Sequence, residues 1–373
     1  MPFLHFYSGN EGYVKACCVS SITYGNINTQ SLEEIWNGEK VEKLREAFIN
    51  GNSDPRCAVC INMESAGGKS IRQETFERFP DFKIEKGTLP KYFDIRFSNV
   101  CNFSCRTCWH GASSSWFKDA EHIGNRASSK AVIQNIKNLE DFLSKTGDAL
   151  LKSEEIYFAG GEPLVTQEHY QLLEFLLENN HTNLKLRYNT NLSHLTFKNW
   201  NILELWTHFE SIEVLMSIDG SDQLGEYVRK GLNWKKFISN AKEINKKANI
   251  KTMISPTVSI FNILHLAELY DTCLQEGIIQ SEDFYLNILE RPYHYNIQCI
   301  PKDIKKKITS FLLQYKGPIE NQISDCLQYM NDKDRSEKYW SKFVSETALL
   351  DKIRKEHIPI DLQSFDSLSY SAK

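Results

Sequence analysis

The sequence lacks any apolar run long enough to cross a membrane, and it has no surplus of basic residues. Its 373 residues include 44 Lys and Arg against 48 Asp and Glu, which gives a formal net charge of −4. The segment Met1-Pro2-Phe3-Leu4-His5 also lacks the charged and apolar blocks of a signal peptide. We therefore expect a cytoplasmic protein without membrane contact. The acidic balance argues against a nucleic-acid partner.

We also expect no structural disulfide bonds. The chain has ten cysteines, but the cytosol keeps thiols reduced. With 41% hydrophobic residues, the chain is long enough for one large domain with smaller additions. Most of the cysteines are clustered, and clustered thiols in a reduced compartment indicate metal sites.

Three cysteines follow a predicted strand in the pattern Cys-x3-Cys-x2-Cys: Cys101, Cys105 and Cys108. The apolar and aromatic residues 92–97 predict the strand. Three thiolates leave one iron of a four-iron cluster without a protein ligand, and chemistry at a metal centre requires such an open position. On the cysteines alone, a zinc knuckle with His110 as fourth ligand has suitable ligand types and spacing.

This pattern resembles the signature of the radical S-adenosylmethionine (radical SAM) superfamily, in which three cysteines bind a 4Fe–4S cluster and S-adenosylmethionine chelates the fourth iron. The resemblance implies reductive cleavage of this cofactor to a 5′-deoxyadenosyl radical, which abstracts a hydrogen atom from a substrate. It also implies an electron donor such as flavodoxin or ferredoxin. Thr107 stands where many members have an aromatic residue near the adenine, so Trp109 and Phe103 are the candidates for that contact.

Strands and helices alternate over residues 91–299. The candidate strands are 93–98, 155–159, 184–189, 212–218, 252–258 and 284–289, with helices such as 130–143, 169–178 and 234–246 between them. This alternation predicts an α/β fold of parallel strands joined by crossover helices. Six such units resemble the partial (β/α)6 TIM-like barrel of the superfamily, in which ligands bind at the carboxyl ends of the strands.

Further motifs follow these strands. Glycines allow a close backbone approach and a carboxylate can pair with an ammonium group. The motif Gly160-Gly161-Glu162-Pro163 resembles the superfamily segment that holds the amino group of the cofactor. The resemblance assigns the ribose and carboxylate contacts to Asn189, Asn191, Ser217, Asp219 and Arg229. A turn or a helix cap is the alternative for each motif.

The first 75 residues predict a separate cysteine-rich module. Cys17 and Cys18 are joined to Cys57 and Cys60 through a helix that begins at the capping box Ser31-Leu32-Glu33-Glu34. This layout resembles the SPASM or twitch modules of radical SAM enzymes and implies a second iron–sulfur cluster, with zinc as the alternative. Because neighbouring side chains on a regular strand point to opposite faces, Cys17 and Cys18 can share one site only if the strand ends or bulges there.

The remaining boundaries follow from the module and the barrel. We expect a linker over residues 76–90, the barrel over 91–299 and a helical C-terminal extension over 300–373. Of the cysteines left over, Cys273, Cys299 and Cys326, one at the barrel mouth could return a hydrogen atom to a substrate. Buried apolar thiols are the simpler expectation for these three.

Auxiliary-cluster enzymes of this type usually modify peptides or proteins. The resemblance therefore implies a peptide or protein substrate, for crosslinking, epimerisation or a similar maturation. The second hypothesis is the same radical chemistry on a sugar, a nucleotide or an amino acid. The third is a zinc-binding interaction protein without turnover.

Overall fold

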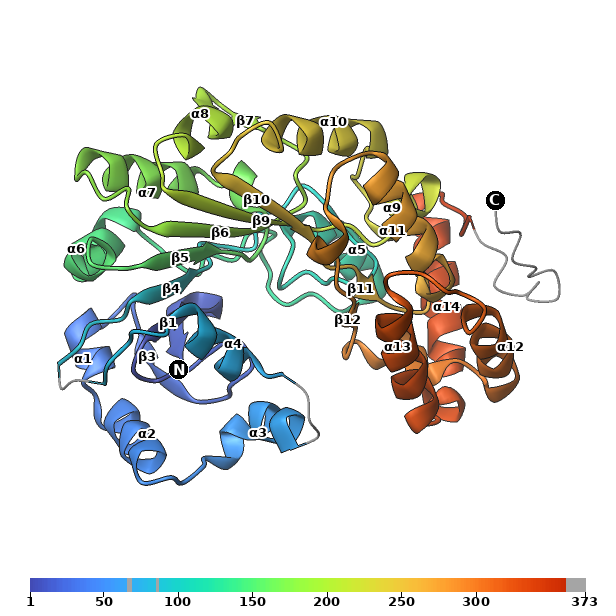
Figure 1. The fold of residues 1–373 in the computed structure, drawn as a ribbon, viewed down its shortest axis with the longest axis horizontal. Coiled ribbons are helices and arrows are strands. Elements are labelled where there is room, and N and C mark those ends of the chain that lie inside the picture. The colour runs from blue at the N-terminus through green and yellow to red at the C-terminus, as the bar shows by residue number, and fades with distance from the viewer. Residues whose placement is uncertain (66–68, 85–86, 360–373) are drawn as a thin grey trace. The chain divides into compact units, whose positions relative to one another are not determined.

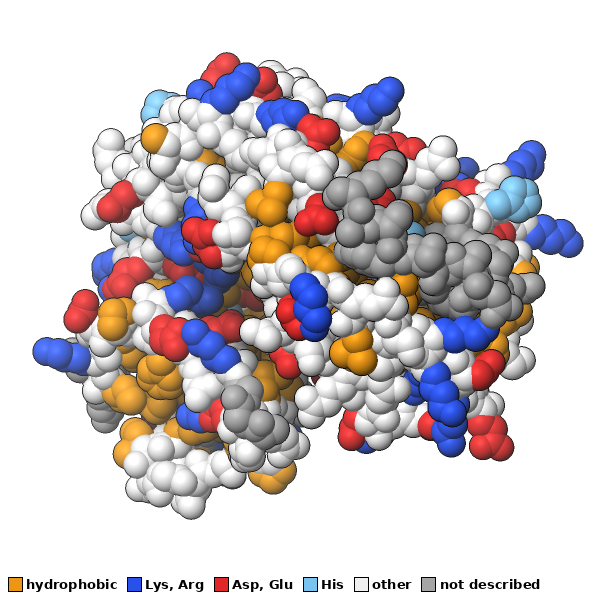
Figure 2. Space-filling view, turned by 45° about the vertical axis from the view of Figure 1, so that its right-hand side comes forward, with side chains coloured by type: hydrophobic (Ala, Val, Ile, Leu, Met, Phe, Trp, Pro, Cys, Tyr) orange, Lys and Arg blue, Asp and Glu red, His pale blue; other side chains and the backbone are white. Residues whose placement is uncertain are grey.

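The computed structural model describes residues 1–65, 69–84 and 87–359, and the chain divides into two compact units. Unit 1 comprises residues 1–100, 132–188 and 198–212, and unit 2 comprises residues 101–131, 189–197 and 213–373. Residues 66–68 of the predicted module, 85–86 of the predicted linker and 360–373 of the predicted extension lie outside the described residues. Acidic and basic side chains are interspersed on the face shown in Figure 2. None of the described helices has both the length and the apolar character needed to cross a bilayer.

An eight-stranded sheet, in the order β10-β9-β6-β5-β4-β1-β2-β3, is the frame of the fold (Figure 1). Its strands are β1 (His5–Ser8), β2 (Tyr13–Lys15), β3 (Thr23–Asn26), β4 (Tyr92–Ile95), β5 (Glu155–Phe158), β6 (Lys185–Thr190), β9 (Ser211–Met216) and β10 (Ile250–Ile254). β4 pairs in parallel with β1 and β5, and β5 pairs in parallel with β6. β2 pairs antiparallel with β1 and β3. The parallel strands with intervening helices confirm the predicted α/β fold.

The last two predicted strands are shorter than expected. Pro256, which has no backbone N–H to donate, separates β10 from β11 (Thr257–Val258). β11 forms a two-stranded parallel sheet with β12 (Asn287–Ile288), the only paired part of the predicted strand 284–289 apart from a bridge between Ile254 and Phe284. A further two-stranded sheet consists of β7 (Thr196–Phe197) and β8 (Trp200–Asn201).

The helices of unit 1 lie on the N-terminal module and beside the parallel strands (Figure 1). They are α1 (Leu32–Trp36), α2 (Glu39–Ile49), α3 (Ala58–Ser65), α4 (Ile71–Arg78), α6 (Leu139–Leu150), α7 (Gln167–Glu178) and α8 (Ile202–Trp206). The predicted capping box is confirmed, because the Ser31 hydroxyl accepts from the Glu34 N–H and the Glu34 carboxylate accepts from the Ser31 N–H. The predicted module helix is split, since α1 ends at its C-cap Asn37 and α2 begins after its N-cap Gly38.

One helix prediction in unit 1 is wrong, and one strand of unit 1 has no counterpart among the predicted strands. The helix predicted over 130–143 is wrong in its first half, because the backbone N–H groups of Asn135 and Ile136 donate to the Phe97 carbonyl at the end of β4. The helix begins only after Asn138, whose side chain accepts from the Asp141 N–H. β1 was not predicted from the sequence, yet it pairs with β4 over its whole length.

Unit 2 ends in the expected helical extension. Its helices are α5 (Phe117–Ile123), α9 (Asp222–Val228), α10 (Trp234–Ile244), α11 (Leu266–Gln275), α12 (Lys302–Leu312), α13 (Glu320–Asp332) and α14 (Ser336–Arg354). Phe343 of α14 packs on Phe261, with ring centroids 5.6 Å apart. Cys273, Cys299 and Cys326 are buried thiols in this unit.

Candidate functional site

The segment just before the cysteine loop is held by the glycine motif after β5. At Gly161, φ is +58° and an added Cβ would lie 2.2 Å from the Val100 carbonyl oxygen, so only glycine fits. The Glu162 N–H donates to the same oxygen at 2.7 Å. Val100 directly precedes Cys101. The turn therefore fixes the point at which the cysteine loop leaves the sheet.

The carboxylate of the glycine motif has a local structural role. Glu162 is buried, and its side chain accepts from the Leu164 N–H at 3.0 Å at the start of the short 3-10 helix Pro163–Val165. The turn and cap that we considered as the alternative are therefore present. Contact of Glu162 with a cofactor amino group stays a prediction.

The cysteine loop itself belongs to unit 2, where it runs along the chain that follows α9. The Ser104 N–H donates to the Lys230 carbonyl at 2.9 Å, and the Arg106 N–H donates to the Val228 carbonyl at 2.8 Å. Gly231 has φ of +108°, and an added Cβ there would lie 2.7 Å from the ring of Phe103. This close approach buries Phe103, whereas Trp109 is 52% exposed, and the adenine contact of either residue stays a prediction.

The three thiols are suitable ligands for an iron–sulfur cluster. Cys101, Cys105 and Cys108 are half-buried and form no disulfide bond with one another. The Phe103 N–H donates to Cys101 Sγ at 3.4 Å. Burial raises the pKa of Cys105, against the lowering influence of the Arg229 guanidinium, and burial raises the pKa of Cys108 to about 12. A metal that binds these thiols stabilises their deprotonated form.

Arg229 and Asp219 form a buried ion pair beside these thiols. Arg229 Nε lies 2.8 Å from Asp219 Oδ2, and a second guanidinium nitrogen donates to Oδ1 at 3.0 Å. The backbone N–H of Thr257 also donates to Asp219, at 2.8 Å. Asp219 is 1% exposed, so its carboxylate compensates the charge of Arg229. Whether either residue touches a cofactor stays a prediction.

The other predicted cofactor ligands of unit 2 lie near the loop or the strand ends. The Asn191 side chain donates to the Asn102 side chain at 3.0 Å, and the Ser217 N–H donates to the Thr190 carbonyl at 2.8 Å. Asn189 Oδ1 is buried, and no group in the described part of the chain donates a hydrogen bond to it. A buried amide oxygen in this state fits a ligand that carries a hydroxyl or ammonium donor.

His110 does not complete a zinc knuckle. It is buried, its Nε2 lies 3.0 Å from the Ala131 carbonyl, and its Nδ1 accepts from the Ala127 N–H at 3.1 Å. Both ring nitrogens therefore contact the backbone, and neither is directed to the cysteines as a ligand. This geometry disfavours the zinc alternative for the loop.

A cavity of about 170 Å³ in unit 1 brings three of the four module cysteines together. Cys17, Cys57 and Cys60 line it, with Arg72 and several apolar side chains. Cys18 is exposed and is not part of the lining. β2 ends at Lys15, so the two neighbouring cysteines lie beyond the regular strand. The ligand set of the module stays a prediction, with Cys17, Cys57 and Cys60 the three that share a cavity.

Neither cysteine group is closed around a common point in this structure. Within residues 1–65, 69–84 and 87–359, no group of three or more His, Cys, Asp or Glu side chains lies close enough to hold a metal ion. One candidate ligand set is therefore defined by the loop that carries Cys101, Cys105 and Cys108. The other is defined by the cavity that Cys17, Cys57 and Cys60 line.

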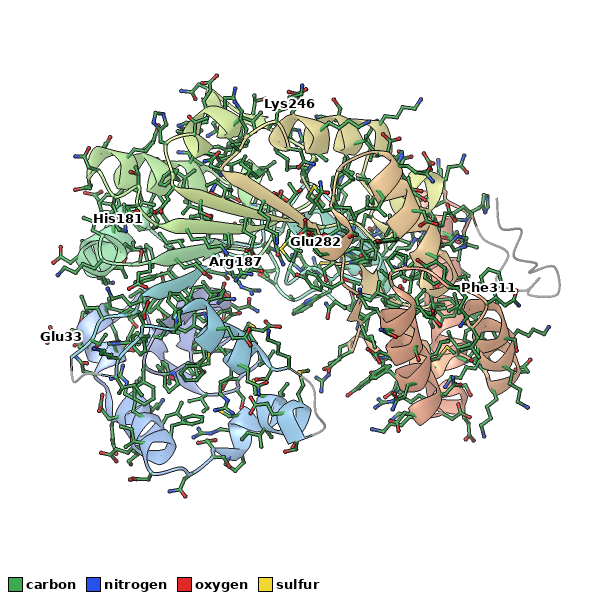
Figure 3. All side chains as sticks on the ribbon, viewed as in Figure 1. Glu33, His181, Arg187, Lys246, Glu282 and Phe311 are labelled. Carbon is green, nitrogen blue, oxygen red and sulfur yellow. The ribbon has the colours of Figure 1, made fainter. Side chains whose placement is uncertain are left out.

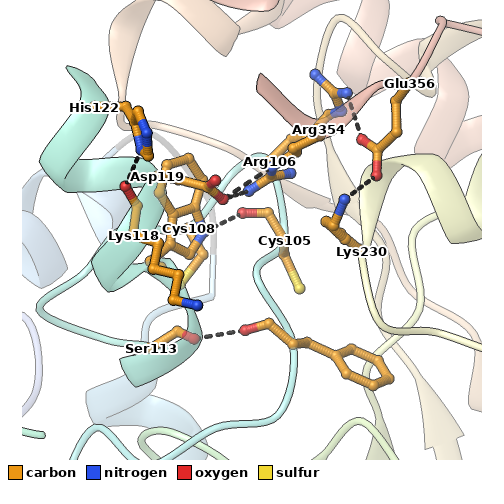
Figure 4. A network of polar contacts seen from close by, with 12 residues as sticks. Cys105, Arg106, Cys108, Ser113, Lys118, Asp119, His122, Lys230, Arg354 and Glu356 are labelled. Atoms are coloured by element: carbon orange, nitrogen blue, oxygen red, sulfur yellow. Dashed lines mark hydrogen bonds and ion pairs between the residues drawn. The ribbon is translucent and has the colours of Figure 1, made fainter. Parts of the chain in front are cut away.

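Sequence reasoning missed one set of residues around the loop. Arg106, between Cys105 and Cys108, is completely buried and pairs with Asp351 and Glu356 near the end of α14. Figure 4 shows the contact with Glu356. The sequence does contain a signal for this pairing, namely a charged residue inside a cysteine motif. A charge buried next to a metal site needs a partner of opposite charge. No local pattern indicates that this partner comes from the C-terminal extension.

Comparison with known proteins yields two family matches. The model of the SPASM family, an iron–sulfur cluster-binding domain, matches residues 1–61, and the model of the radical SAM superfamily matches residues 95–272. A curated relative, the radical SAM cyclopropyl synthase TigE of Paramaledivibacter caminithermalis, is 26% identical over 175 residues. That match covers 45% of this chain and 35% of the relative, so this chain spans about a third of the relative's length.

Two solved structures match this chain at low similarity. Streptococcus suis SuiB bound to the precursor peptide SuiA is 15% identical, with a TM-score of 0.41, covering 74% of this chain and 59% of that one. The enzyme anSMEcpe with bound AdoMet is 19% identical, with a TM-score of 0.40, covering 65% of this chain and 60% of that one.

Each of the two cysteine groups in the sequence lies within one of the two matched domains. The radical SAM domain implies a 4Fe–4S cluster with S-adenosylmethionine, and the SPASM domain implies a further iron–sulfur cluster. The zinc-binding interaction protein is thereby disfavoured. The chain belongs to the radical SAM superfamily and carries a SPASM domain at its N-terminal end.

Proposed function

We propose that this protein reductively cleaves S-adenosylmethionine and abstracts a hydrogen atom from a peptide or protein substrate, as a maturase of the crosslinking or epimerising type. When bound, the cluster and S-adenosylmethionine supply the radical chemistry. One observation carries the proposal. The three cysteines stand on a loop whose flanks are fixed by backbone hydrogen bonds from Glu162, Ser104 and Arg106, and all three are half-buried residues.

The residues of the chain have separate roles in this proposal. Cys101, Cys105 and Cys108 are the cluster ligands, and a flavodoxin or ferredoxin supplies the electron. The cofactor amino group is assigned to the Gly160-Gly161-Glu162-Pro163 motif. Its ribose and carboxylate are assigned to Asn189, Asn191, Ser217, Asp219 and Arg229. The buried Asn189 oxygen without a donor and the Arg229 charge near Cys105 support these assignments.

The face of the sheet in unit 1 supports a polar substrate. Tyr7, Asp94, Tyr157 and Arg187 lie side by side across β1, β4, β5 and β6 (Arg187 is labelled in Figure 3). Their neighbours along the strands, such as Phe158 and Tyr188, pack against α7 and α8. Because successive side chains alternate between faces, this polar row lies on the side opposite those helices.

The row offers several kinds of hydrogen-bonding and charged groups. Arg96, just beyond β4, pairs with Asp94 at 3.2 Å and covers the Tyr7 ring at 5.0 Å. Arg187 donates to Glu155 at 3.3 Å. Tyr7 and Asp94 are buried, whereas Tyr157 and Arg187 are partly exposed. A peptide presents amides and charged side chains that match these two exposed groups, which supports a peptide substrate.

The first test measures cluster and cofactor chemistry together. The protein is purified and reconstituted without air, and iron, sulfide and 5′-deoxyadenosine formation with dithionite are measured for wild type and for Cys101→Ala/Cys105→Ala/Cys108→Ala. We expect about eight irons per wild-type chain and about four in the variant, from the stoichiometry of two 4Fe–4S clusters. We expect 5′-deoxyadenosine from wild type only. Its absence from iron-loaded wild type would overturn the proposal.

The peptide assignment has its own test. A candidate precursor peptide, such as one encoded beside the gene, is synthesised with deuterium at its Cα and side-chain carbons and incubated with the reconstituted enzyme. Deuterium in 5′-deoxyadenosine, together with a change in peptide mass, is the expected result, because the hydrogen atom removed from the peptide ends in that product. The triple cysteine variant is the control. Cleavage of the cofactor without deuterium transfer from the peptide would favour the small-molecule hypothesis.

A further inference from the structure

The C-terminal end of α14 contacts the back of the cysteine loop, although α14 lies beyond residue 272, where the superfamily match ends. We propose that Asp351, Arg354 and Glu356 form a clasp that positions the cysteine loop, and with it the cluster. This inference rests on the proposed function. All of its members belong to unit 2.

Arg106 is the first point of contact. Its side chain is 0% exposed, and its terminal nitrogen lies 2.5 Å from Asp351 and 2.8 Å from Glu356. Its Nε donates to the Tyr227 carbonyl at 3.2 Å, and its guanidinium covers the Tyr227 ring at 3.6 Å. A buried guanidinium is costly unless it is paired, so the two carboxylates hold Arg106 in this position.

The two carboxylates are themselves fixed. The Tyr227 hydroxyl donates to Asp351 at 2.9 Å, and the Lys230 ammonium donates to Glu356 at 2.7 Å. Tyr227 and Lys230 belong to the same stretch of chain that receives the backbone hydrogen bonds of the cysteine loop. Movement of the loop therefore requires several charged contacts to break together.

Arg354 is the second point of contact, on the other side of the loop (Figure 4). Its guanidinium donates to Asp119 at 2.7 Å and covers the Trp116 ring at 4.8 Å. The Trp116 indole N–H donates to the Cys105 carbonyl at 2.7 Å. A continuous chain of contacts thus joins α14 to the backbone of one proposed cluster ligand.

The contacts of the clasp differ from ordinary packing of a helix. Arg106 stands between two cysteines, and its charge and those of its partners lie beside the cluster site. Removing a carboxylate leaves an extra positive charge there, which favours the reduced cluster. A charge change of this kind alters the reduction potential, whereas a helix that only adds stability has no reason to alter it.

The test uses the full chain with its clusters reconstituted without air. The signal that responds to added S-adenosylmethionine in electron paramagnetic resonance identifies the cluster of the loop, and its reduction potential is titrated. The variants are Asp351→Asn and Glu356→Gln, with Asp351→Glu to restore the charge. The matched control is Glu337→Gln, an exposed carboxylate at the other end of α14.

We expect a more positive potential in Asp351→Asn and Glu356→Gln than in wild type, and recovery in Asp351→Glu. Iron release from this cluster to a chelator should become about 10–100-fold faster, the effect that losing a supporting residue around a metal site typically has on metal affinity. The control should match wild type. If Asp351→Asn fails to fold, the potential and iron release of Glu356→Gln decide whether the clasp exists. This variant should fold because the Glu356 side chain is 22% exposed.

The two possible failures are distinct. A wild-type signal that Asp351→Asn and Glu356→Gln leave unchanged in potential and iron release would overturn the clasp alone. A wild-type protein with no signal that responds to S-adenosylmethionine would overturn the proposed function, and the clasp with it, because the loop would hold no cluster to position.

Discussion

The turn at Gly161 is the most direct place to test whether the backbone of one motif positions another. An alanine at Gly161 would hold its Cβ 2.2 Å from the Val100 carbonyl oxygen, where 3.4 Å is the closest ordinary contact. The carbonyl must therefore move by about 1 Å, and overpacking of this kind costs about 1–3 kcal/mol. The hydrogen bond from the Glu162 N–H contributes about 1 kcal/mol more when it breaks.

The backbone conformation adds a cost that a control can separate. Gly161 has φ of +58°, and an L-residue in that region costs about 1 kcal/mol. Gly51, also in unit 1, has φ of +72° with no atom within 4 Å of an added Cβ. Gly51→Ala should therefore lose about 1 kcal/mol of unfolding free energy. Gly161→Ala should lose about 3–5 kcal/mol, the sum of the three contributions.

The assay is urea unfolding of both variants, with iron per chain measured after reconstitution. Because Val100 precedes Cys101, Gly161→Ala should also retain less iron than Gly51→Ala. Equal losses of stability and equal iron contents in the two variants would refute the reasoning, since the backbone strain that both substitutions share would then account for the whole effect.

Other predictions concern single residues. Asp219→Ala leaves Arg229 buried without its partner and should cost about 3 kcal/mol or more of unfolding free energy in urea; a loss below about 1 kcal/mol would mean that Arg229 finds water or another partner. Cys17→Ser should lower the iron content of the N-terminal domain and Cys18→Ser should not, since only Cys17 lines the cavity; an equal loss in both would restore Cys18 as a ligand. Burial lowers the pKa of His169 from 6.5 to about 3. Unfolding free energy should therefore fall as pH drops below 6.5, because only the unfolded state then binds the proton, and His169→Gln should reduce that slope by up to about 1.4 kcal/mol per pH unit. An unchanged slope in this variant would contradict the burial argument.

Local patterns predicted the elements that carry the motifs. The alternation of apolar residues located β5 and β6 to within about a residue, and the Ser31 capping box located the start of α1. These features depend on residues that are close together in the sequence, so they can be predicted from the sequence alone. The same holds for the cysteine spacing, which identifies the loop without any knowledge of distant contacts.

The errors came from contacts between distant segments. Residues 132–136 have a composition that suits a helix, but hydrogen bonds to the end of β4 hold part of this segment extended. β1 is only four residues long, too short for a periodic pattern to be visible. The pairing of Arg106 with Asp351 spans 245 residues of sequence. No local propensity reports a partner at that separation.

The unpredicted strand β1 also explains how a cysteine-rich domain can precede the barrel in the chain. β1 pairs in parallel with β4, the strand that leads into the cysteine loop, and antiparallel with β2, which ends two residues before Cys17. The sheet therefore continues without interruption from β4 through β1 to β2. A mutation that weakens the pairing of β1 with β4 should consequently affect both cysteine groups, because each begins at the end of a strand that β1 holds in place.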